Sequence, residues 1–115
     1  MKNWTVSFMK DAAEERNHLD ASARNQVDKA IRKVSQNPLP RNEGGYGSPL
    51  GNKHGINLTG CCKIKLKGIG IRVVYKLLRD GGVMRIIVIA ARADEEVYEV
   101  AANRMKRFSQ GGIDL

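Results

Sequence analysis

The sequence predicts an α+β fold with an antiparallel sheet of about four strands. Residues 56–91 contain three consecutive stretches in which apolar and polar side chains alternate, separated by short glycine-rich segments. Helical periodicity flanks this region on both sides, and a short alternating segment precedes the first helical pattern. We therefore expect an N-terminal strand, two helices, three antiparallel strands and a C-terminal helix.

The N-terminal third is expected to form the first strand and two helices. In Asn3–Met9, apolar side chains alternate with polar or small ones, which indicates a half-buried strand. Good helix formers follow over Asp11–Leu19, and Asp20 or Ser22 can cap a second helix. Asn37-Pro38 stops that helix, because the residue before a proline disfavours helical geometry. The apolar face of the second helix consists of Ala23, Val27, Ala30, Ile31 and Val34.

The middle of the chain is expected to form a long loop and then the hairpins. Leu39–Gly55 contains two of the three prolines and several glycines in a polar setting, which is typical of a loop. Strands are predicted at Ile56–Lys67, Ile71–Leu78 and Val83–Ala91, and the turns between them suit antiparallel hairpins. The last of these strands has a run that is apolar on both faces, which favours a central place in the sheet.

The C-terminal helix is expected to begin near Asp94, which can cap it. Acidic side chains in its first turn and basic side chains in its last turn match the helix dipole. Gly111-Gly112 would end it, and residues 109–115 are expected to form a flexible tail. With 115 residues, the chain is predicted to form a single domain over residues 1–115.

Positive charge is concentrated in the expected sheet. The net charge is +8, and residues 37–91 hold nine basic and two acidic side chains. Alternation along a strand places Lys63, Lys65 and Lys67 on one face. Arg72 and Lys76 share one face of the next strand in the same way. A rigid sheet with so many cations indicates a site for a polyanion, either nucleic acid or an acidic protein.

Composition argues against several other kinds of site. Cys61 and Cys62 are adjacent, so their side chains leave opposite faces of a strand and a disulfide framework is not expected. His18 and His54 lie in different segments, and we expect no metal and no cofactor. We find no signal-peptide core and no run near the roughly 18–20 apolar residues that span a bilayer. Free thiols and the missing membrane signals favour a cytoplasmic protein.

The basic face has the groups that RNA cleavage without a metal requires. RNA carries its own nucleophile, the 2′-hydroxyl, so the protein must supply a base, a cation for the phosphorane and an acid for the leaving oxygen. Lysines crowded on one face repel one another, which favours the neutral amine that acts as a base. Arg72 can clamp a phosphate, and Arg92 and Tyr98 can project towards the same edge of the sheet.

Each of these residues also has a purely structural interpretation. Alternating lysines usually form a solvated face. Arg92 can pair with Asp94 or Glu96, and Tyr98 can be a helix residue half-buried against the sheet. The residue pattern alone therefore leaves catalysis and simple surface charge as open alternatives.

The segments CCKIKLKGIGIRVVYKL and RADEEVYEVAANRM, together with the order of elements, resemble the RelE toxins of bacterial toxin–antitoxin modules. The resemblance covers nearly the whole chain and implies the RelE-like microbial RNase fold. It also implies binding at the ribosomal A site and mRNA cleavage by 2′-hydroxyl attack without a metal. A cognate RelB-like antitoxin, acidic and partly disordered, would neutralise the toxin.

The resemblance assigns roles to five residues of the expected type. Lys63 and Lys65 would bind the RNA backbone and help to activate the 2′-hydroxyl. Arg72 would stabilise the phosphorane, and Arg92 would serve the leaving oxygen. Tyr98 would position the nucleotide by stacking on it.

Three features depart from the family's pattern. Ala90-Ala91 stands where many relatives have Gly-Lys, Cys62 replaces a common tyrosine, and Leu39–Gly55 is longer than the usual connection. The first two departures weaken expected RNA contacts, and the third alters ribosome docking or antitoxin fit.

Lys67 and Lys76 are expected to hold RNA without taking part in the chemistry.

Two further functions stay open. ParE-like toxins of the same superfamily keep the fold, lack this catalytic set and inhibit DNA gyrase. A basic RNA-binding module without toxicity would keep the cationic sheet and lack the chemistry.

Overall fold

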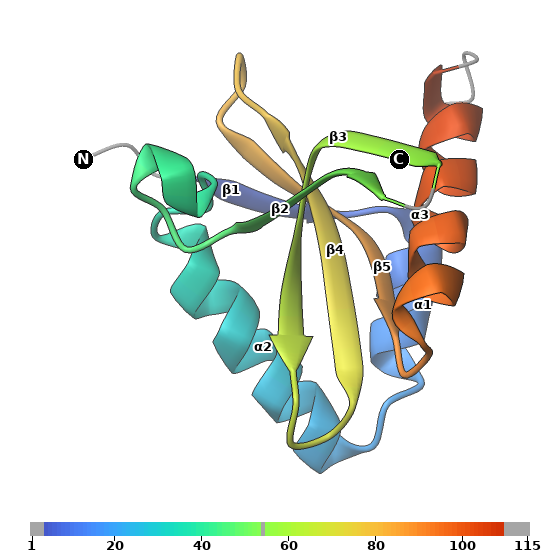
Figure 1. The fold of residues 1–115 in the computed structure, drawn as a ribbon. Helices are drawn as coiled ribbons and strands as arrows, with labels where there is room; N and C mark the ends of the chain where they lie inside the picture. Colours follow the sequence, from blue (N-terminus) through green and yellow to red (C-terminus); the bar gives the residue numbers. More distant parts are fainter. Residues whose placement is uncertain (1–3, 54, 110–115) are drawn as a thin grey trace.

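In the computed structural model, which describes residues 4–53 and 55–109, helices pack around one five-stranded mixed sheet (Figure 1). The α+β class and the predicted order of the main elements are confirmed. The elements in chain order are β1 (Thr5–Phe8), α1 (Lys10–Asn17), α2 (Ala21–Ser35), a short 3₁₀ helix (Arg41–Glu43), β2 (Ser48–Lys53), β3 (Ile56–Leu66), β4 (Ile71–Leu78), β5 (Val83–Ala90) and α3 (Asp94–Ser109).

The strand order in the sheet is β1-β5-β4-β3-β2. The two predicted hairpins, β3 with β4 and β4 with β5, are antiparallel as expected. Two expectations about the sheet are wrong: β1 pairs with β5 in parallel, and the middle strand is β4 rather than β5. The middle position moves because β2, a fifth strand that the sequence did not predict, adds to the far edge beside β3.

The segment predicted as a long loop is largely structured. It contains the 3₁₀ helix and β2, and its Pro40 forms an isolated bridge with Gly47. The pairing of β2 with β3 shifts register between Pro49 and Gly51, as expected at an edge strand where a proline cannot donate to the ladder. The segment packs closely on the sheet. At Gly47 it lies so near the hydroxyl of Tyr75 that a Cβ at this position would clash with it.

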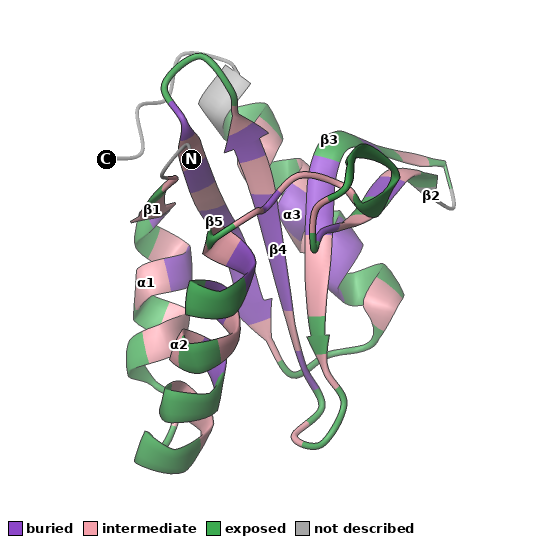
Figure 2. Cartoon of the chain, turned by 90° about the vertical axis from the view of Figure 1, so that its left-hand side faces the viewer, coloured by how far each residue is buried: buried purple, intermediate pink, exposed green. Residues whose placement is uncertain are grey.

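Helices α2 and α3 lie on opposite sides of the sheet (Figure 1). Asp20 caps α2 by accepting a hydrogen bond from the backbone N–H of Ala23 at 2.8 Å, as predicted. The predicted apolar face of α2 buries Val27, Ile31 and Val34. Figure 2 shows β4 and β5 buried along most of their length, which explains why β5 lacks a polar face.

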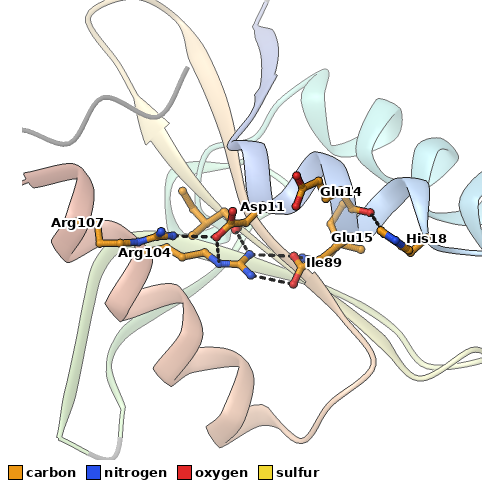
Figure 3. A network of polar contacts seen from close by, with 8 residues as sticks. Asp11, Glu14, Glu15, His18, Ile89, Arg104 and Arg107 are labelled. Atoms are coloured by element: carbon orange, nitrogen blue, oxygen red, sulfur yellow. Dashed lines mark hydrogen bonds and ion pairs between the residues drawn. The ribbon is translucent and has the colours of Figure 1, made fainter.

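The edge of β5 beyond the end of β1 is closed by an ion-pair network between α1 and α3 (Figure 3). Arg104 of α3 donates two hydrogen bonds of 2.9 Å to the carboxylate of Glu15 in α1. Arg104 also donates to the carbonyl of Ile87 at 2.8 Å, and Glu15 accepts from the N–H of Ile89 at 3.0 Å. These side chains satisfy backbone groups that no strand of the described chain pairs there, and they fix α3 against the sheet.

The last helix is described as far as Ser109, which was expected to start the flexible tail. Gly111-Gly112, the predicted end of the helix, lies outside the described residues, and so does His54. Within residues 4–53 and 55–109, no helix has the length and apolar character needed to cross a membrane.

Candidate active site

The register of β3 and β4 places three of the expected catalytic cations, Lys63, Lys65 and Arg72, on the face of the sheet that α3 covers. Lys65 pairs with Arg72, and Lys63 pairs with Val74. Residues that face each other across antiparallel strands point to the same side, so these cations form one group. The opposite side of β4 is apolar and buried, as the alternation predicts; it carries Ile71, Val73, Tyr75 and Leu77.

Arg72 is held at the corner where β5 leads into α3. Its Nε donates a hydrogen bond to the carboxylate of Asp94, the first residue of α3. Its Nη1 donates to the backbone carbonyl of Arg92 at 2.6 Å. The side chain of Arg72 is 19% exposed and that of Asp94 is 37% exposed, so the pair lies at the surface of the molecule and can meet a ligand.

The charge of Asp94 is stabilised by this cationic surrounding. Partial burial alone would raise the pKa of the carboxyl group. The hydrogen bond from Arg72 and the positive charges of Arg72, Lys65 and Lys63 outweigh burial, and the pKa of Asp94 is lowered. Asp94 is therefore an anion near neutral pH, and the positive charges of Lys65 and Lys63 stabilise it.

Lys63 and Tyr98 meet between β3 and α3. The ammonium of Lys63 donates to the hydroxyl oxygen of Tyr98 across 3.3 Å. Tyr98 is only 3% exposed, so it is more deeply buried than either interpretation of the sequence allowed. A nucleobase cannot stack on the ring in this arrangement, because α3 and the sheet enclose it. The contact available to the site is the hydroxyl group.

The remaining cations are more open. Lys65, Lys67 and Arg92 are exposed, and no hydrogen bond joins their side chains to the described part of the chain. Lys76 lies apart from this group, because it is four residues from Arg72 along β4, about 13 Å at the usual rise of a strand. The structure thus brings together Lys63, Lys65, Arg72 and Tyr98, with Arg92 beside them at the start of the α3 corner.

The arrangement is suited to binding a phosphate group. Several cations converge at one corner of the sheet, and one of them is an arginine with a fixed guanidinium. Among the described residues, no cluster of His, Cys, Asp and Glu side chains is placed to hold a metal ion. The chemistry that these side chains offer is charge stabilisation and proton transfer.

The two cysteines are core residues. Both thiols are free and about 1% exposed. Burial is the main reason that the pKa of Cys61 is raised to about 11, and it also raises the pKa of Cys62. A thiol with a raised pKa is a poor nucleophile at neutral pH, so these groups do not offer covalent catalysis.

Sequence reasoning missed the contact between Arg72 and Asp94. Asp94 was expected to cap its helix, and Arg92 was the arginine considered as its partner. The signal that was available is the excess of cations on the two neighbouring strands, which favours a counter-charge nearby. The contact spans 22 positions in the chain, so local spacing does not reveal it.

Comparison with known proteins identifies similar sequences and structures. The chain is 29% identical over 103 residues to an Escherichia coli protein described as RelE-like toxin, covering 90% of this chain and 98% of that protein. A mutant of the E. coli toxin RelE in the free state superposes with a TM-score of 0.72 and 26% identity, covering 90% of this chain and 99% of that one. No family model matches the sequence.

Structures of toxin–antitoxin complexes are also similar. The same E. coli RelE mutant in complex with an antitoxin RelB peptide is 27% identical, with a TM-score of 0.64, covering 87% of this chain and 95% of that one. A RelBE toxin–antitoxin complex from Mycobacterium tuberculosis has a TM-score of 0.62 at 23% identity, covering 82% of this chain and 97% of that one, and supports the fold alone.

Proposed function

We propose that this chain, which is similar to RelE toxins in sequence and fold, belongs to the RelE/ParE superfamily, is the toxin of a type II toxin–antitoxin pair and cleaves mRNA on the ribosome. The observation that carries this proposal is the convergence of Lys63, Lys65 and Arg72 at the α3 corner, with Arg92 exposed beside them. The group has the charge and the arginine that a phosphodiester in its transition state requires.

The reaction is an internal transesterification. The 2′-hydroxyl oxygen attacks the adjacent phosphorus, and the bond from phosphorus to the 5′-oxygen of the next nucleotide breaks. Lys63 and Lys65 bind the backbone and help to take the proton of the 2′-hydroxyl, and Arg72 stabilises the phosphorane. Arg92 acts on the leaving 5′-oxygen, which takes up a proton as its bond to phosphorus breaks. Tyr98 acts through its hydroxyl group, which holds the ammonium of Lys63. No resident metal or cofactor takes part.

The RNA is held by a wider surface than the reacting group. Lys67 is exposed just beyond the end of β3, and it extends the cationic row of that strand towards solvent. Lys76 binds RNA at a distance from the scissile phosphate, because it lies farther along β4. Both lysines act by neutralising phosphate charge, so their loss weakens binding and its salt dependence.

The partner that neutralises the toxin is a RelB-like antitoxin. The E. coli RelE mutant, a solved structure similar to this chain, forms a complex with a peptide of the antitoxin RelB. The net charge of +8 favours an acidic, partly disordered segment that folds as it binds. Toxin, antitoxin and ribosome meet in the cytoplasm.

Controlled expression in a bacterial host, followed by mapping of mRNA ends, tests the proposed function. The wild type should halt growth and cut mRNA within codons, whereas Arg72→Ala and Arg92→Ala should allow growth because the cleavage rate falls about 10²–10³-fold. Arg32→Ala is the matched control, because this exposed arginine of α2 lies outside the site and its loss removes the same charge. It should stay toxic.

The same experiment separates the other two functions. Growth arrest with a DNA damage response and intact mRNA would identify a gyrase inhibitor of the ParE type. Normal growth with a stably expressed protein would identify a basic RNA-binding module. Either result would refute cleavage of mRNA by this chain.

A further inference from the structure

The guanidinium of Arg72 has two protein partners at the α3 corner. The carboxylate of Asp94 accepts from Nε, and the backbone carbonyl of Arg92 accepts from Nη1. A guanidinium has five N–H donors, so three remain for a ligand. All three belong to Nη1 and Nη2, which form the end of the fork. The two contacts therefore leave the part of the side chain that grips a phosphate available.

The cations around Arg72 would disfavour this position without a counter-charge. Lys65 lies directly opposite Arg72 in the neighbouring strand, and like charges in such a pair repel each other. Lys63 precedes Lys65 on the same face, and Arg92 follows the end of β5, just before α3. Among the described residues, Asp94 is the acidic group that contacts Arg72 directly, and its pKa is lowered by the hydrogen bond from Arg72 and by the charges of Arg72, Lys65 and Lys63.

We propose that Asp94 is a positioning residue, which fixes the guanidinium of Arg72 so that the free end of its fork meets the scissile phosphate. The assignment rests on the proposed function. Asp94 does not touch the RNA, and it acts by limiting the rotamers of Arg72 beside three other cations. Reacting groups that are held in place need less reorganisation in the transition state.

A competing role would give the opposite result. Asp94 is an anion bound to the group that the phosphate needs, so it would inhibit the enzyme if it occupied the phosphate site itself. Removing it would then raise the rate and tighten RNA binding. A positioning residue, in contrast, lowers the maximal rate when it is lost and leaves binding intact or slightly stronger, since a negative charge is removed.

The test is single-turnover cleavage of mRNA on programmed ribosomes, measured over a range of toxin concentrations. Asp94→Ala should lower the maximal rate about 10-fold, because the guanidinium loses its fixed geometry. The half-saturating concentration should not rise. Asp94→Asn keeps an oxygen acceptor for Nε and should recover most of the rate. A maximal rate of Asp94→Ala equal to or above wild type would overturn the proposal.

Glu96→Ala is the matched control. Glu96 is an exposed acidic residue in the same turn of α3, and no contact joins it to Arg72 in the described structure. Its loss changes the net charge as Asp94→Ala does, and the maximal rate should stay at the wild-type value. An equal loss of rate in both variants would assign the effect to charge alone and refute positioning.

A spectroscopic measurement does not depend on cleavage. In ¹⁵N-labelled protein, NMR can measure how fast the proton on Nε of Arg72 exchanges with water. Exchange should be slow in the wild type and rapid in Asp94→Ala, because the carboxylate that accepts this proton is lost. If the wild type fails to cut mRNA, the proposed function fails, and this exchange rate still decides whether Asp94 holds Arg72. Equal exchange in the two proteins would show that it does not.

Discussion

Single residues of the site differ in how much of their role is structural. Arg72 is 19% exposed and bonded at two of its nitrogens, whereas Lys65 and Arg92 are open to solvent. Tyr98 is nearly inaccessible and meets the site only through its hydroxyl oxygen. A side chain with a dual role must be changed by the smallest possible step, because a large truncation mixes the loss of chemistry with the loss of packing.

Tyr98→Phe separates these two contributions. The variant keeps the buried ring and removes the acceptor of Lys63, so the free energy of unfolding should change by about 1 kcal/mol or less. Cleavage on the ribosome should nevertheless slow, because the ammonium of Lys63 is no longer held. Tyr98→Ala should lose about 3–5 kcal/mol of unfolding free energy. Cleavage at the wild-type rate by Tyr98→Phe would refute a role for the hydroxyl group.

At the scale of the elements, the site depends on how α3 is fixed to the sheet. Arg104 ties α3 to α1 and to the open edge of β5, and its side chain is 13% exposed. Arg107, one turn later, is 60% exposed and pairs with Asp11 at 2.9 Å. Arg104 also pairs with Asp11 at 3.4 Å, so the two arginines of this helix differ both in burial and in the number of contacts they make.

Arg104→Ala should lower the free energy of unfolding by about 2–4 kcal/mol, because the carboxylate of Glu15 and the carbonyl of Ile87 lose the hydrogen bonds and the charge of the guanidinium. Arg107→Ala should cost less than about 1 kcal/mol, since its ion pair is exposed to solvent. Denaturant titration measures both. Equal losses in the two variants would show that the network does not anchor α3.

The packing of α1 on α2 should depend on pH. Arg16 donates to both carboxylate oxygens of Asp28, at 2.7 and 2.6 Å, and this hydrogen bonding is the main reason that the pKa of Asp28 is lowered from its ordinary value of 3.8. A carboxyl group with a lowered pKa in the folded state stabilises the fold above its unfolded pKa and loses that contribution as the pH falls below it. The ion pair therefore weakens in acid.

Asp28→Asn should be less stable than the wild type near neutral pH and should lose less stability on acidification. Unfolding titrations between about pH 6 and pH 3 measure the difference, which should narrow as the pH falls. A constant difference over this range would mean that the ion pair with Arg16 does not contribute through its charge.

For the whole molecule, residue alternation was enough to predict the central hairpins and the shared face of Lys63, Lys65 and Arg72, because period-two patterns determine which side chains share a face. It was not enough to predict β2. That strand contains Pro49 and Gly51, and pairing with β3 stabilises it more than any local preference does. The burial of Tyr98 and the contact of Arg72 with Asp94 also depend on how α3 packs, which local patterns do not encode.

The proposed function requires of the whole molecule that it cuts RNA by using the RNA's own 2′-hydroxyl group. The direct measurement is the chemistry of the mRNA ends produced on programmed ribosomes. We expect a 2′,3′-cyclic phosphate on the upstream fragment and a 5′-hydroxyl on the downstream fragment, so a ligase that needs a 5′-phosphate should accept the downstream fragment only after phosphorylation by a kinase. Fragments with 5′-phosphate ends, or mRNA left intact by folded wild-type protein, would refute cleavage by 2′-hydroxyl attack.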